Sequence, residues 1–540
     1  MKATPSPSPS FLQAPRIPKP RYSYSTPHNK HKHKHKHELK LPTSRISIRL
    51  LASQNPTNSC PQNAHYRDPG NSSLFFWTAT EIAEAVNGRV VKWGPPGTIS
   101  TDTRTLEPNQ WFFAIAGQNF DAHDFINPEL SEKGCVGVIG NRVCENWDKG
   151  FVEVNGDTVS SLMKMAYYAR NRFNGAVVGV TGSVGKTTTK SMIALALESL
   201  GNPVYQSPGN WNTRIGVALS LIGIPRNAGV VVLEMGMSTR GEILELARMA
   251  RPSIRVILNV GASHLENFSS LEEVAMAKGE ILVNAKPGDV CVLNADDPLV
   301  MSLPIPYGVK KVLFGRSEGC DVRLIVAENV DGGLGVRVVL EKNKEKVEVL
   351  IPSPGLHLAL NACAAAAVTT LLGASLFEVG MCLSRFYPVH MRLELEVAKN
   401  GIKILNDVYN ANPVSAKAAI DSLKSIDCCG KRVSILGDML ELGSMEIESH
   451  QMILNHCCDS QIDLVGLVGK RFFAAAENLN LFDKIDTVHA YDAANLALEI
   501  MKRLDCNDVV LVKGSRAMKM ERVADAIKAM DIQIHVNCDI

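Results

Sequence analysis

The sequence of 540 residues lacks several features that define whole classes of protein. It contains no run close to the ~20 apolar residues that cross a bilayer, and its best stretch, 362–372, is interrupted by Thr369 and Thr370. Its 13 cysteines form no CxxC pair and no ligand-like spacing with histidine. This pattern favours reduced, buried thiols over a zinc site. We therefore expect no transmembrane segment and no structural zinc.

Two catalytic fingerprints are also missing from the chain. No GxSxG lies on a strand–turn–helix, so the strained serine elbow of the α/β-hydrolases is not expected. No GxGxxG opens a βα unit, which excludes the usual dinucleotide fingerprint.

Net charge is nearly absent, with 57 Lys and Arg against 55 Asp and Glu, but the balance is uneven along the chain. Residues 1–50 hold 11 bases and one acid, Glu38, so residues 51–540 hold 46 bases and 54 acids, a net charge of −8. A body of this charge has no general field that attracts phosphate backbones, so nucleic acid is not expected as a partner.

The basic N-terminus is rich in Ser and Pro and poor in apolar residues, so we expect residues 1–73 to be a disordered leader and linker. It lacks a compact apolar h-region and resembles an organellar transit peptide, of the chloroplast type because Ser and Pro dominate. The interleaved lysines of the His/Lys tract 31–37 would repel a metal ion. We expect the folded chain to begin near Leu74 and to reside in the chloroplast stroma after the leader is removed.

The remainder of the chain is long enough for about three domains, at ~100–200 residues each. Short β-branched runs, spaced by helix-length segments, indicate buried parallel strands of βαβ units. They lie at 176–180, 230–236, 256–261 and 289–297. This alternation predicts an α/β fold, with a central domain over 173–388.

Other regions of the chain have a different pattern of apolar and polar residues. Residues 74–172 form a smaller mixed domain, with a helix capped by Thr78 and Glu81 and a linking helix over 158–172. Residues 321–350 predict an antiparallel hairpin around Asp331-Gly332-Gly333, and an Ala-rich helix follows at 360–373. Strands near 402–407, 432–438, 464–469 and 508–514 predict a second α/β unit over 389–540.

The segment 177–190, VVGVTGSVGKTTTK, places a buried strand before a glycine-rich turn and a helix start. Backbone N–H groups, the helix dipole and Lys186 suit a triphosphate, and Thr187 can hold Mg²⁺. The strict GxxxxGK[ST] pattern fails by one residue, because position 180 is Val. We expect an ATP-binding loop made of Thr181, Gly182, Ser183, Val184, Gly185, Lys186, Thr187 and Thr188.

Two further polar residues follow predicted strands. Glu234 ends one strand, where its carboxylate can reach a metal held by Thr187, and His264 is placed at the end of the next. Ligands in such folds bind at the carboxyl edge of the sheet. The residues alone therefore predict an Mg²⁺–ATP enzyme with a second α/β domain and leave its acceptor open.

These segments resemble the Mur ligase family over nearly all of 74–540. The matching pieces are TGSVGKTTT (181–189), EMGMSTRGEI (234–243), NVGASHLENFSSLEEVAMAKGEI (259–281), LNADDP (293–298), NDVYNANP (406–413), LGDMLELG (436–443) and VKGSRAMKME (512–521). The resemblance implies a UDP-binding N-terminal domain, a central P-loop-like ATPase domain and a Rossmann-like C-terminal domain.

The resemblance also implies an activity. DVYNANP and KGSRAMKME are similar to the branch that joins D-alanyl-D-alanine to UDP-N-acetylmuramoyl-tripeptide for peptidoglycan synthesis, using ATP and passing through an acyl phosphate. A carboxylate that attacks a triphosphate needs charge neutralisation at the γ-phosphate. By resemblance, two Mg²⁺ ions supply it together with Lys186, His264 and Arg392, and a carbamate on Lys278 joins Glu234 and His264 as a metal ligand. The enzyme is expected to act as a monomer.

The remaining site residues come from the same resemblance. Asn294, Asn361, Arg392 and Asp407 match ATP-side positions of the family. The substrate-side matches are Thr101, Arg104, Asn210, Asn212, Tyr409, Asn410, Asn412, Ser515 and Arg516. An arginine near a peptide carboxylate can form a bidentate clamp, whereas each asparagine alone is equally suited to turn formation.

The chain departs from the family pattern at three positions. Met391 replaces the usual Gly before Arg392, Val408 replaces a usual Ser, and Ala122 replaces a usual Gly. A methionine restricts backbone angles at a predicted hinge. Two alternatives therefore stay open: a folylpolyglutamate-type glutamate ligase, which lacks the two C-terminal segments, and a non-catalytic regulatory nucleotide-binding protein, suggested by Met391 and Val408.

Overall fold

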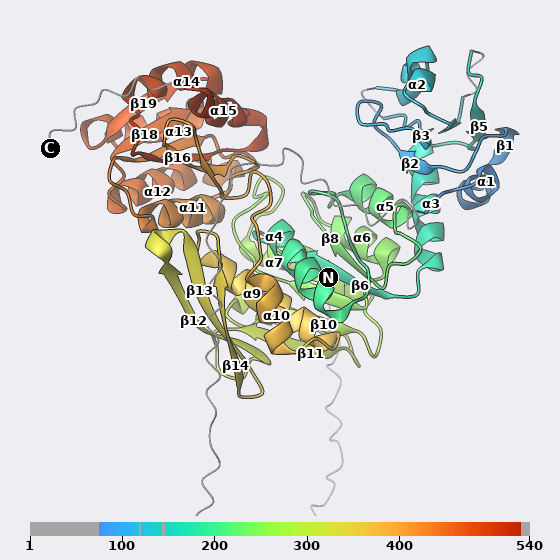
Figure 1. Ribbon diagram of the computed structural model, residues 1–540, viewed down its shortest axis with the longest axis horizontal. Helices are drawn as coiled ribbons and strands as arrows, with labels where there is room; N and C mark the ends of the chain where they lie inside the picture. Colours follow the sequence, from blue (N-terminus) through green and yellow to red (C-terminus); the bar gives the residue numbers. More distant parts are fainter. Residues whose placement is uncertain (1–74, 118–119, 143–145, 531–540) are drawn as a thin grey trace, which may run out of the picture. The chain divides into compact units, whose positions relative to one another are not determined.

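The computed structural model describes residues 75–117, 120–142 and 146–530. Within them lie three β-sheets, each with its own helices (Figure 1). The predicted leader, the His/Lys tract and the predicted start at Leu74 fall outside the described residues. In the part that is described, no helix is both long and apolar enough to cross a membrane.

The first sheet has five strands in the order β1-β5-β4-β3-β2, parallel except for the β1–β5 pair. Thr78 and Glu81 form the predicted capping box at the start of α1 (Ala79–Val86), and α3 (Thr158–Arg172) has the predicted bounds. The other elements are β1 (Arg89–Lys92), β2 (Thr98–Ser100), β3 (Gln110–Phe113), α2 (Pro128–Glu132), β4 (Gly137–Gly140) and β5 (Gly150–Glu153).

An aromatic clasp at the end of α3 holds the first described residues. The guanidinium of Arg172 lies 3.8 Å from the ring centroids of both Phe75 and Trp77, a cation–π arrangement. Arg226 lies 4.6 Å from the Phe75 ring, and Trp77 Nε1 donates to the carbonyl of Ile222. The clasp therefore fastens the first described residues to the end of α5 (Arg214–Ile222) and the loop that follows it.

The second sheet has nine strands in the order β14-β13-β12-β11-β10-β9-β6-β8-β7. Parallel pairing from β7 to β11 confirms the βαβ prediction, because helices connect these strands along the chain. β12 also pairs in parallel with β11 but follows it through a short loop. The strands are β6 (Ala176–Thr181), β7 (Val204–Gln206), β8 (Val230–Glu234), β9 (Ile254–Ile257), β10 (Val290–Asn294), β11 (Lys310–Gly315), β12 (Val322–Val330), β13 (Gly335–Lys342) and β14 (Glu345–Ile351).

The predicted hairpin at 321–350 is a three-stranded meander. β12 pairs antiparallel with β13 across Asp331–Gly333, as expected, but the second arm turns again and continues as β14. Asn343 and Lys344 form this extra turn with φ values of 52° and 69°. Positive φ at both central residues defines the tight hairpin turn whose twist matches that of the strands.

Helices cover both faces of the central sheet. Buried side chains of α5, α6 (Glu242–Ala250) and α7 (Leu271–Val283) pack in one hydrophobic cluster. Those of α4 (Lys186–Leu197), α9 (His357–Leu371) and α10 (Leu376–Leu383) pack in another. The predicted Ala-rich helix is α9, and its buried alanines let it pack closely on α4. A four-residue helix, α8 (Pro298–Met301), follows β10.

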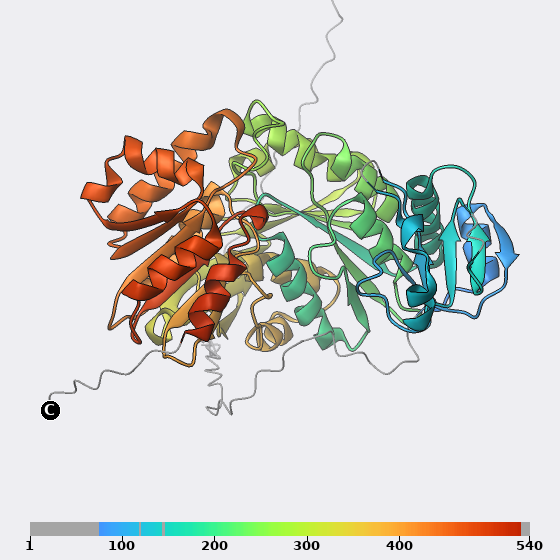
Figure 2. The ribbon, with the colours of Figure 1, turned by 90° about the horizontal axis from the view of Figure 1, so that it is seen from above.

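The third sheet has six strands in the order β15-β16-β20-β17-β18-β19, parallel except for the β15 edge. Figure 2 shows helices on both of its sides, and the two hydrophobic clusters of this region divide in the same way. The strands are β15 (Glu394–Val397), β16 (Lys403–Asp407), β17 (Arg432–Gly437), β18 (Leu464–Val468), β19 (Asp486–Ala490) and β20 (Val509–Lys513). The helices are α11 (Pro413–Ser425), α12 (Glu446–Asp459), α13 (Lys470–Asn478), α14 (Ala493–Ile500) and α15 (Glu521–Ala529).

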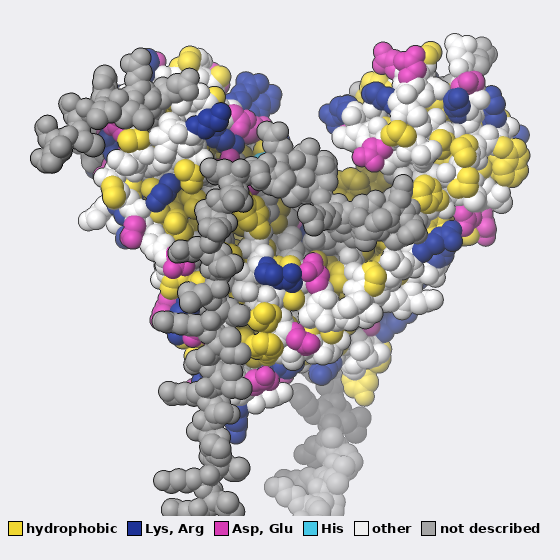
Figure 3. All heavy atoms as spheres, in the orientation of Figure 1, with side chains coloured by type: hydrophobic (Ala, Val, Ile, Leu, Met, Phe, Trp, Pro, Cys, Tyr) yellow, Lys and Arg dark blue, Asp and Glu magenta, His cyan; other side chains and the backbone are white. Residues whose placement is uncertain are grey.

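Charged side chains are distributed over the surface of the described residues. On the face drawn in Figure 3, dark-blue and magenta side chains lie interspersed with white and yellow ones. Side chains of both signs occur over this face, so this view gives no guide to where an anionic ligand binds.

Candidate active site

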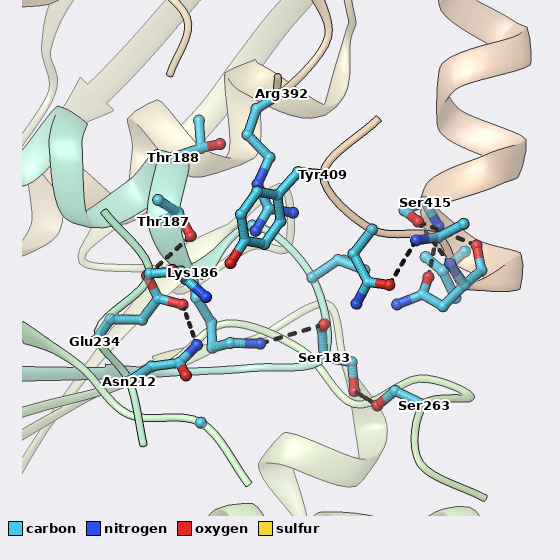
Figure 4. Close-up of a pocket in the computed structure, with 18 of the residues that line it drawn as sticks. Ser183, Lys186, Thr187, Thr188, Asn212, Glu234, Ser263, Arg392, Tyr409 and Ser415 are labelled. Carbon is cyan, nitrogen blue, oxygen red and sulfur yellow. Dashed lines mark hydrogen bonds between the residues drawn. The ribbon is translucent and has the colours of Figure 1, made fainter. Parts of the chain in front are cut away.

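A cleft of about 1050 Å³ opens at the carboxyl edge of the central sheet. Strands β8, β6 and β9 are parallel neighbours there, so their ends deliver side chains to the same edge. The lining also includes the loops that follow β16, β17 and β20 of the third sheet. Figure 4 shows its centre, with Lys186, Thr187, Glu234, Arg392 and Tyr409 close together.

The predicted phosphate loop lies between β6 and α4. Gly185, with φ of 83°, is the N-cap of α4, and Lys186 is the first helical residue. A Cβ on Gly185 would lie 2.7 Å from Oδ1 of Asn361, so both the left-handed backbone and the close neighbour require glycine. The loop is held by Asn259, whose side chain bonds the N–H and the carbonyl of Val184.

Lys186 turns its ammonium back over this loop. Nζ donates to the carbonyl of Gly182 at 2.8 Å. Burial lowers the pKa of Lys186, the charge of Glu234 opposes that shift, and the charge of Arg392 adds to it. A cation placed among free backbone N–H groups is suited to phosphate oxygens.

Glu234 is the centre of a buried polar cluster. Its Oε2 accepts from the Thr187 hydroxyl at 2.8 Å, its Oε1 accepts from Asn212 Nδ2 at 2.7 Å, and Lys190 Nζ lies 3.7 Å from Oε2 (Figure 4). The carboxylate thus reaches Thr187, as the sequence predicted. A hydroxyl and a carboxylate oxygen are ligands that Mg²⁺ accepts.

His264 does not end a strand, contrary to the prediction. β9 stops at Ile257, because the chain there turns into a loop in which His264 has φ of 58°. Its Nδ1 lies 2.6 Å from Oε2 of Glu441, in the loop after β17. Burial lowers the pKa of His264, with Glu441 opposing the shift, so the neutral imidazole is favoured.

Lys278 lies on α7 and is buried, with 2% of its surface exposed. Burial holds its pKa well below the usual value, and the charge of Lys186 adds to the effect. Lys278 is close enough to lower the pKa of His264 in turn, although it does not line the cleft itself. Lys278 is therefore a buried lysine and not part of the exposed face of its helix.

Two predicted ATP-side asparagines differ in their surroundings. Asn361 lines the cleft from α9, and its buried Nδ2 has no hydrogen-bond partner among the described residues. Such a donor fits a ligand acceptor, because buried polar groups are normally paired. Asn294 does not line the cleft; its Nδ2 donates to Leu258 and its Oδ1 accepts from Asp296 N–H.

The predicted hinge carries two residues in the left-handed region. Met391 and Leu393 have φ of 62° and 51°, on either side of Arg392. The Arg392 guanidinium stacks 4.0 Å from the Tyr409 ring centroid. Asp407 accepts from Leu393 N–H through Oδ1 and from Lys513 Nζ through Oδ2. Asp407 therefore fastens the hinge to the third sheet.

The predicted acceptor residues gather on the cleft. Tyr409, Asn410, Asn412, Ser515 and Arg516 line it, as do Asn210 and Asn212 from the loop after β7. Asn412 also caps α11, its Oδ1 accepting from Ser415 N–H, which matches the turn-forming alternative. Ser515 Oγ accepts from Leu440 N–H, and Arg516 lies 3.4 Å from Glu521 and remains largely exposed.

Thr101 and Arg104 lie apart from this cleft, beyond the end of β2 in the first sheet. Arg104 is exposed and binds Asp102 through two hydrogen bonds, of 2.9 Å and 2.6 Å. This pair fixes the guanidinium on the surface of its own domain. The proposed uridine-diphosphate role of both residues stays a prediction.

Sequence reasoning missed several polar residues of the site. They are Lys190, Asn259, Glu441 and Lys513. The last three lie within segments that resemble the family, and Lys190 directly follows one of them. The spacing of Lys186 and Lys190, one helical turn apart, was the available signal for Lys190.

Comparison with known proteins agrees with this arrangement. Residues 180–369 match the Mur ligase middle domain, and 391–516 match the Mur ligase, glutamate ligase domain. A relative from Bacillus subtilis (strain 168), named UDP-N-acetylmuramoyl-tripeptide--D-alanyl-D-alanine ligase, is 34% identical over 452 residues, covering 83% of this chain and 97% of the relative.

Solved structures with the same architecture are also similar. The crystal structure of MurF from Acinetobacter baumannii has a TM-score of 0.74 and 28% identity, covering 85% of this chain and all of that one. The MurF ligase from Thermotoga maritima in complex with ADP has a TM-score of 0.68 and 30% identity, covering 80% of this chain and 97% of that one.

Proposed function

Because this chain belongs to the Mur ligase family, we propose that it joins D-alanyl-D-alanine to UDP-N-acetylmuramoyl-tripeptide, using ATP and releasing ADP and phosphate. The observation that carries the proposal is the cleft, which combines the phosphate loop with the predicted acceptor residues of the third sheet. The Bacillus subtilis relative that is named for this activity is covered over 97% of its length.

The first step places the terminal carboxylate of the tripeptide against the γ-phosphate of ATP. The carboxylate oxygen forms a bond to phosphorus, the bond to the β-bridging oxygen breaks, and ADP leaves. Two anions approach each other, so the main requirement is positive charge at the transferred group. Two cations line the part of the cleft near the phosphate loop: Lys186 at the start of α4 and Arg392 beside Tyr409.

Nucleotide binding fits the residues present. α4 is capped by Gly185, a position whose backbone conformation and close neighbour Asn361 favour a residue without a side chain. The Nδ2 of Asn361, which has no hydrogen-bond partner among the described residues, lies beside this glycine. We assign Asn361 to the base of the nucleotide and the loop 182–188 to its phosphates. Asn294, whose side chain bonds only to backbone, is the weakest member of the predicted ATP set.

Mg²⁺ fits the oxygen pair of Thr187 and Glu234. When bound, it would neutralise charge on the phosphates. Within the described residues, no group of three or more His, Cys, Asp and Glu is placed to hold a metal. A second ion near His264 would thus need a further oxygen ligand from elsewhere.

We propose that a carbamate on Lys278 supplies this ligand. Its buried amine has a pKa well below the usual value, so the neutral nucleophile is available. Nitrogen forms a bond to the carbon of CO₂ and loses a proton, which leaves an oxygen-bearing anion. Carbon-13 NMR of the folded enzyme in ¹³C-bicarbonate buffer should show a carbamate resonance, and Lys278→Arg should abolish it. The absence of this resonance from the folded, active enzyme would refute the carbamate.

In the second step the amine of D-alanyl-D-alanine attacks the acyl phosphate carbon, and phosphate leaves as the amide forms. The dipeptide has a free carboxylate, and Arg516 offers a guanidinium with half of its surface exposed at the cleft. A planar guanidinium binds a carboxylate through two parallel hydrogen bonds. We assign Arg516 and Ser515 to this end of the dipeptide.

Residues 74–540 with ATP and Mg²⁺ provide the test. Phosphate should be released only when the UDP-linked tripeptide and D-alanyl-D-alanine are both present. Release that ignores the tripeptide would refute the assignment. A pterin substrate with glutamate in place of the two acceptors tests the glutamate-ligase alternative, and complementation of a ligase-deficient cell by Lys186→Ala tests the regulatory one.

We also propose that residues 1–73 direct the enzyme to the chloroplast stroma. The support is compositional, since this leader holds 11 bases and one acid within its first 50 residues. A fluorescent protein fused to residues 1–73 should enter plastids, while one fused to residues 74–140 should not. Accumulation of the first fusion in the cytosol would contradict the proposal.

A further inference from the structure

A buried lysine that the proposed reaction does not use lies beneath the cleft. Lys190 is on α4, one helical turn after Lys186, and only 2% of its surface is exposed. Its Nζ donates to the carbonyl of Ser207 at 2.8 Å and to that of Gly209, and it lies 3.7 Å from Glu234 Oε2. Two N–H groups of the ammonium therefore have carbonyl acceptors, and the nearby Glu234 carboxylate balances the buried charge.

The two carbonyls belong to the loop between β7 and α5. Residues 208–211 of this loop are exposed to solvent, so few packing contacts on their outer side hold the loop in place. The loop carries Asn210 and Asn212 to the cleft. Gly209 lies in its middle, and among the described residues Lys190 is the side chain that bonds its carbonyl. An exposed loop is thus held from below by a buried cation.

The same ammonium faces the metal-side carboxylate. Glu234 bonds Thr187 through one oxygen and Asn212 through the other (Figure 4). Its own N–H donates to Ser207 Oγ. Lys190 therefore contacts both ends of one cluster: the loop that carries Asn212 and the carboxylate to which Asn212 donates.

We propose that Lys190 is a positioning residue that holds the loop 207–213 against Glu234. It thereby couples binding of the UDP-linked tripeptide by this loop to the position of the carboxylate on the metal side. This inference rests on the proposed ligase function and adds to it a residue that does not touch substrate. The loop is assigned to the UDP-linked tripeptide, because its Asn212 donates to Glu234, whose carboxylate also bonds Thr187 next to the phosphate loop, rather than to the β20 end with Arg516.

Loss of Lys190 should weaken the binding of one substrate and leave that of the nucleotide unchanged. A methionine at position 190 keeps the length and volume of the side chain but removes its charge and its donors, so the loop loses its central anchor. Binding of the tripeptide substrate then weakens, while the phosphate loop, held by Asn259 from the loop after β9, is retained. A fully general loss of stability would affect every substrate alike.

The experiment compares Lys190→Met, Lys190→Gln and Lys190→Arg, with Lys346→Met on the exposed face of β14 as a matched control. KM is measured for each substrate in turn by phosphate release, ADP affinity by calorimetry, and amide exchange of residues 207–213 by mass spectrometry. We expect KM for the tripeptide to rise by about tenfold or more in Lys190→Met, with ADP affinity within about twofold, since small displacements of positioning groups have large effects.

Lys190→Gln should lie between Lys190→Met and the unmodified enzyme, and Lys190→Arg, which keeps the charge, should recover most of the affinity. Exchange of residues 207–213 should accelerate most in Lys190→Met and less in Lys190→Gln, and it should stay unchanged in Lys190→Arg and in Lys346→Met. Unchanged KM or unchanged exchange in folded variants would overturn the inference, as would failure of all three variants to fold, which would mark a purely structural lysine. Absence of activity in the unmodified enzyme would instead refute the ligase proposal, and the exchange comparison would still decide the role of Lys190.

Discussion

The ammonium of Lys513 lies 2.6 Å from Oδ2 of Asp407, at paired positions on the neighbouring parallel strands β20 and β16. Both groups are largely buried, and burial lowers the pKa of Lys513 while the charge of Asp407 opposes that shift. The other carboxylate oxygen accepts from Leu393 N–H beside Arg392. One ion pair thus connects the sheet to the hinge.

Lys513→Met should therefore destabilise the protein strongly. It leaves Asp407 as a buried carboxylate with one backbone partner, a change that costs about 3–5 kcal/mol in comparable buried pairs. Urea unfolding followed by tryptophan fluorescence measures the loss. The double variant Asp407→Leu with Lys513→Met removes both charges and should recover part of it, whereas a loss below about 1 kcal/mol in the single variant would contradict the pairing.

Lys186→Ala should reduce phosphate release by at least about 100-fold, because it removes the cation of the phosphate loop where charge develops. The chain should stay folded, since Lys186 Nζ bonds only to loop carbonyls. Lys346→Ala, on an exposed strand, is the control. Comparable rates for the Lys186→Ala and unmodified enzymes would show that the loop does not act on the reacting phosphate.

Thr187→Ala should shift the Mg²⁺ dependence. The hydroxyl that donates to Glu234 would be lost, so the Mg²⁺ concentration for half-maximal activity should rise by about tenfold, while Thr187→Ser should stay within about twofold. The titration is carried out at saturating ATP. If Ala and Ser variants behaved alike, the hydroxyl would have no part in metal binding.

Met391→Gly and Met391→Ala should reverse their usual order of stability. At φ of 62° an L-residue pays ~1–2 kcal/mol that glycine does not, although both variants lose the thioether contact with Arg516. The Gly variant should therefore be more stable than the Ala variant by about 1 kcal/mol. Equal stability, or a more stable Ala variant, would show that the strain is absent in solution.

His450 should make stability depend on pH. It is fully buried, accepts from Met439 N–H, and burial lowers its pKa to about 4 from an ordinary 6.5. The unfolded chain binds a proton below about 6.5 and the native chain only below about 4, so stability is full at pH 7 and is lost as pH falls between these values.

Between pH 7 and pH 5, this one group should account for about 2 kcal/mol of lost stability. His450→Gln keeps a donor and an acceptor but does not titrate. Over the same pH interval its free energy of unfolding should therefore fall by about 2 kcal/mol less than that of the unmodified protein. Urea unfolding at the two pH values gives the comparison. Identical pH profiles for the two proteins would assign the acid sensitivity to other groups.

The sequence predicted the elements with strong local signals. The capping box of Thr78 and Glu81, the bounds of α3 and the strand–glycine–helix order around Lys186 follow from patterns within a few residues. The turn at Asn343 and Lys344 was missed, because it has no glycine and interrupts an alternation that continues on both sides. Short edge strands such as β15 and β19 gave no signal long enough to recognise.

Residues of the site could be predicted from the sequence only where they belong to a local motif. Glu234 follows directly from its strand end, but its contacts with Asn212 and Lys190 depend on how β7 and α4 pack. His264 was placed too close to β9, because nothing in the sequence marks the end of that strand at Ile257. The pairing of Asp407 with Lys513 joins residues more than a hundred positions apart, which no local pattern encodes.

The clasp of Arg172 on Phe75 and Trp77 has a bearing on maturation. A protease that removed the leader anywhere up to residue 74 would leave both rings in place. One that cut after Phe75 would remove one of the three rings around the Arg172 guanidinium, leaving Trp77 and Tyr168, and would take away the ring that Arg226 contacts. If the proposed leader is removed, the clasp therefore sets a downstream limit for a cut that keeps all of these contacts.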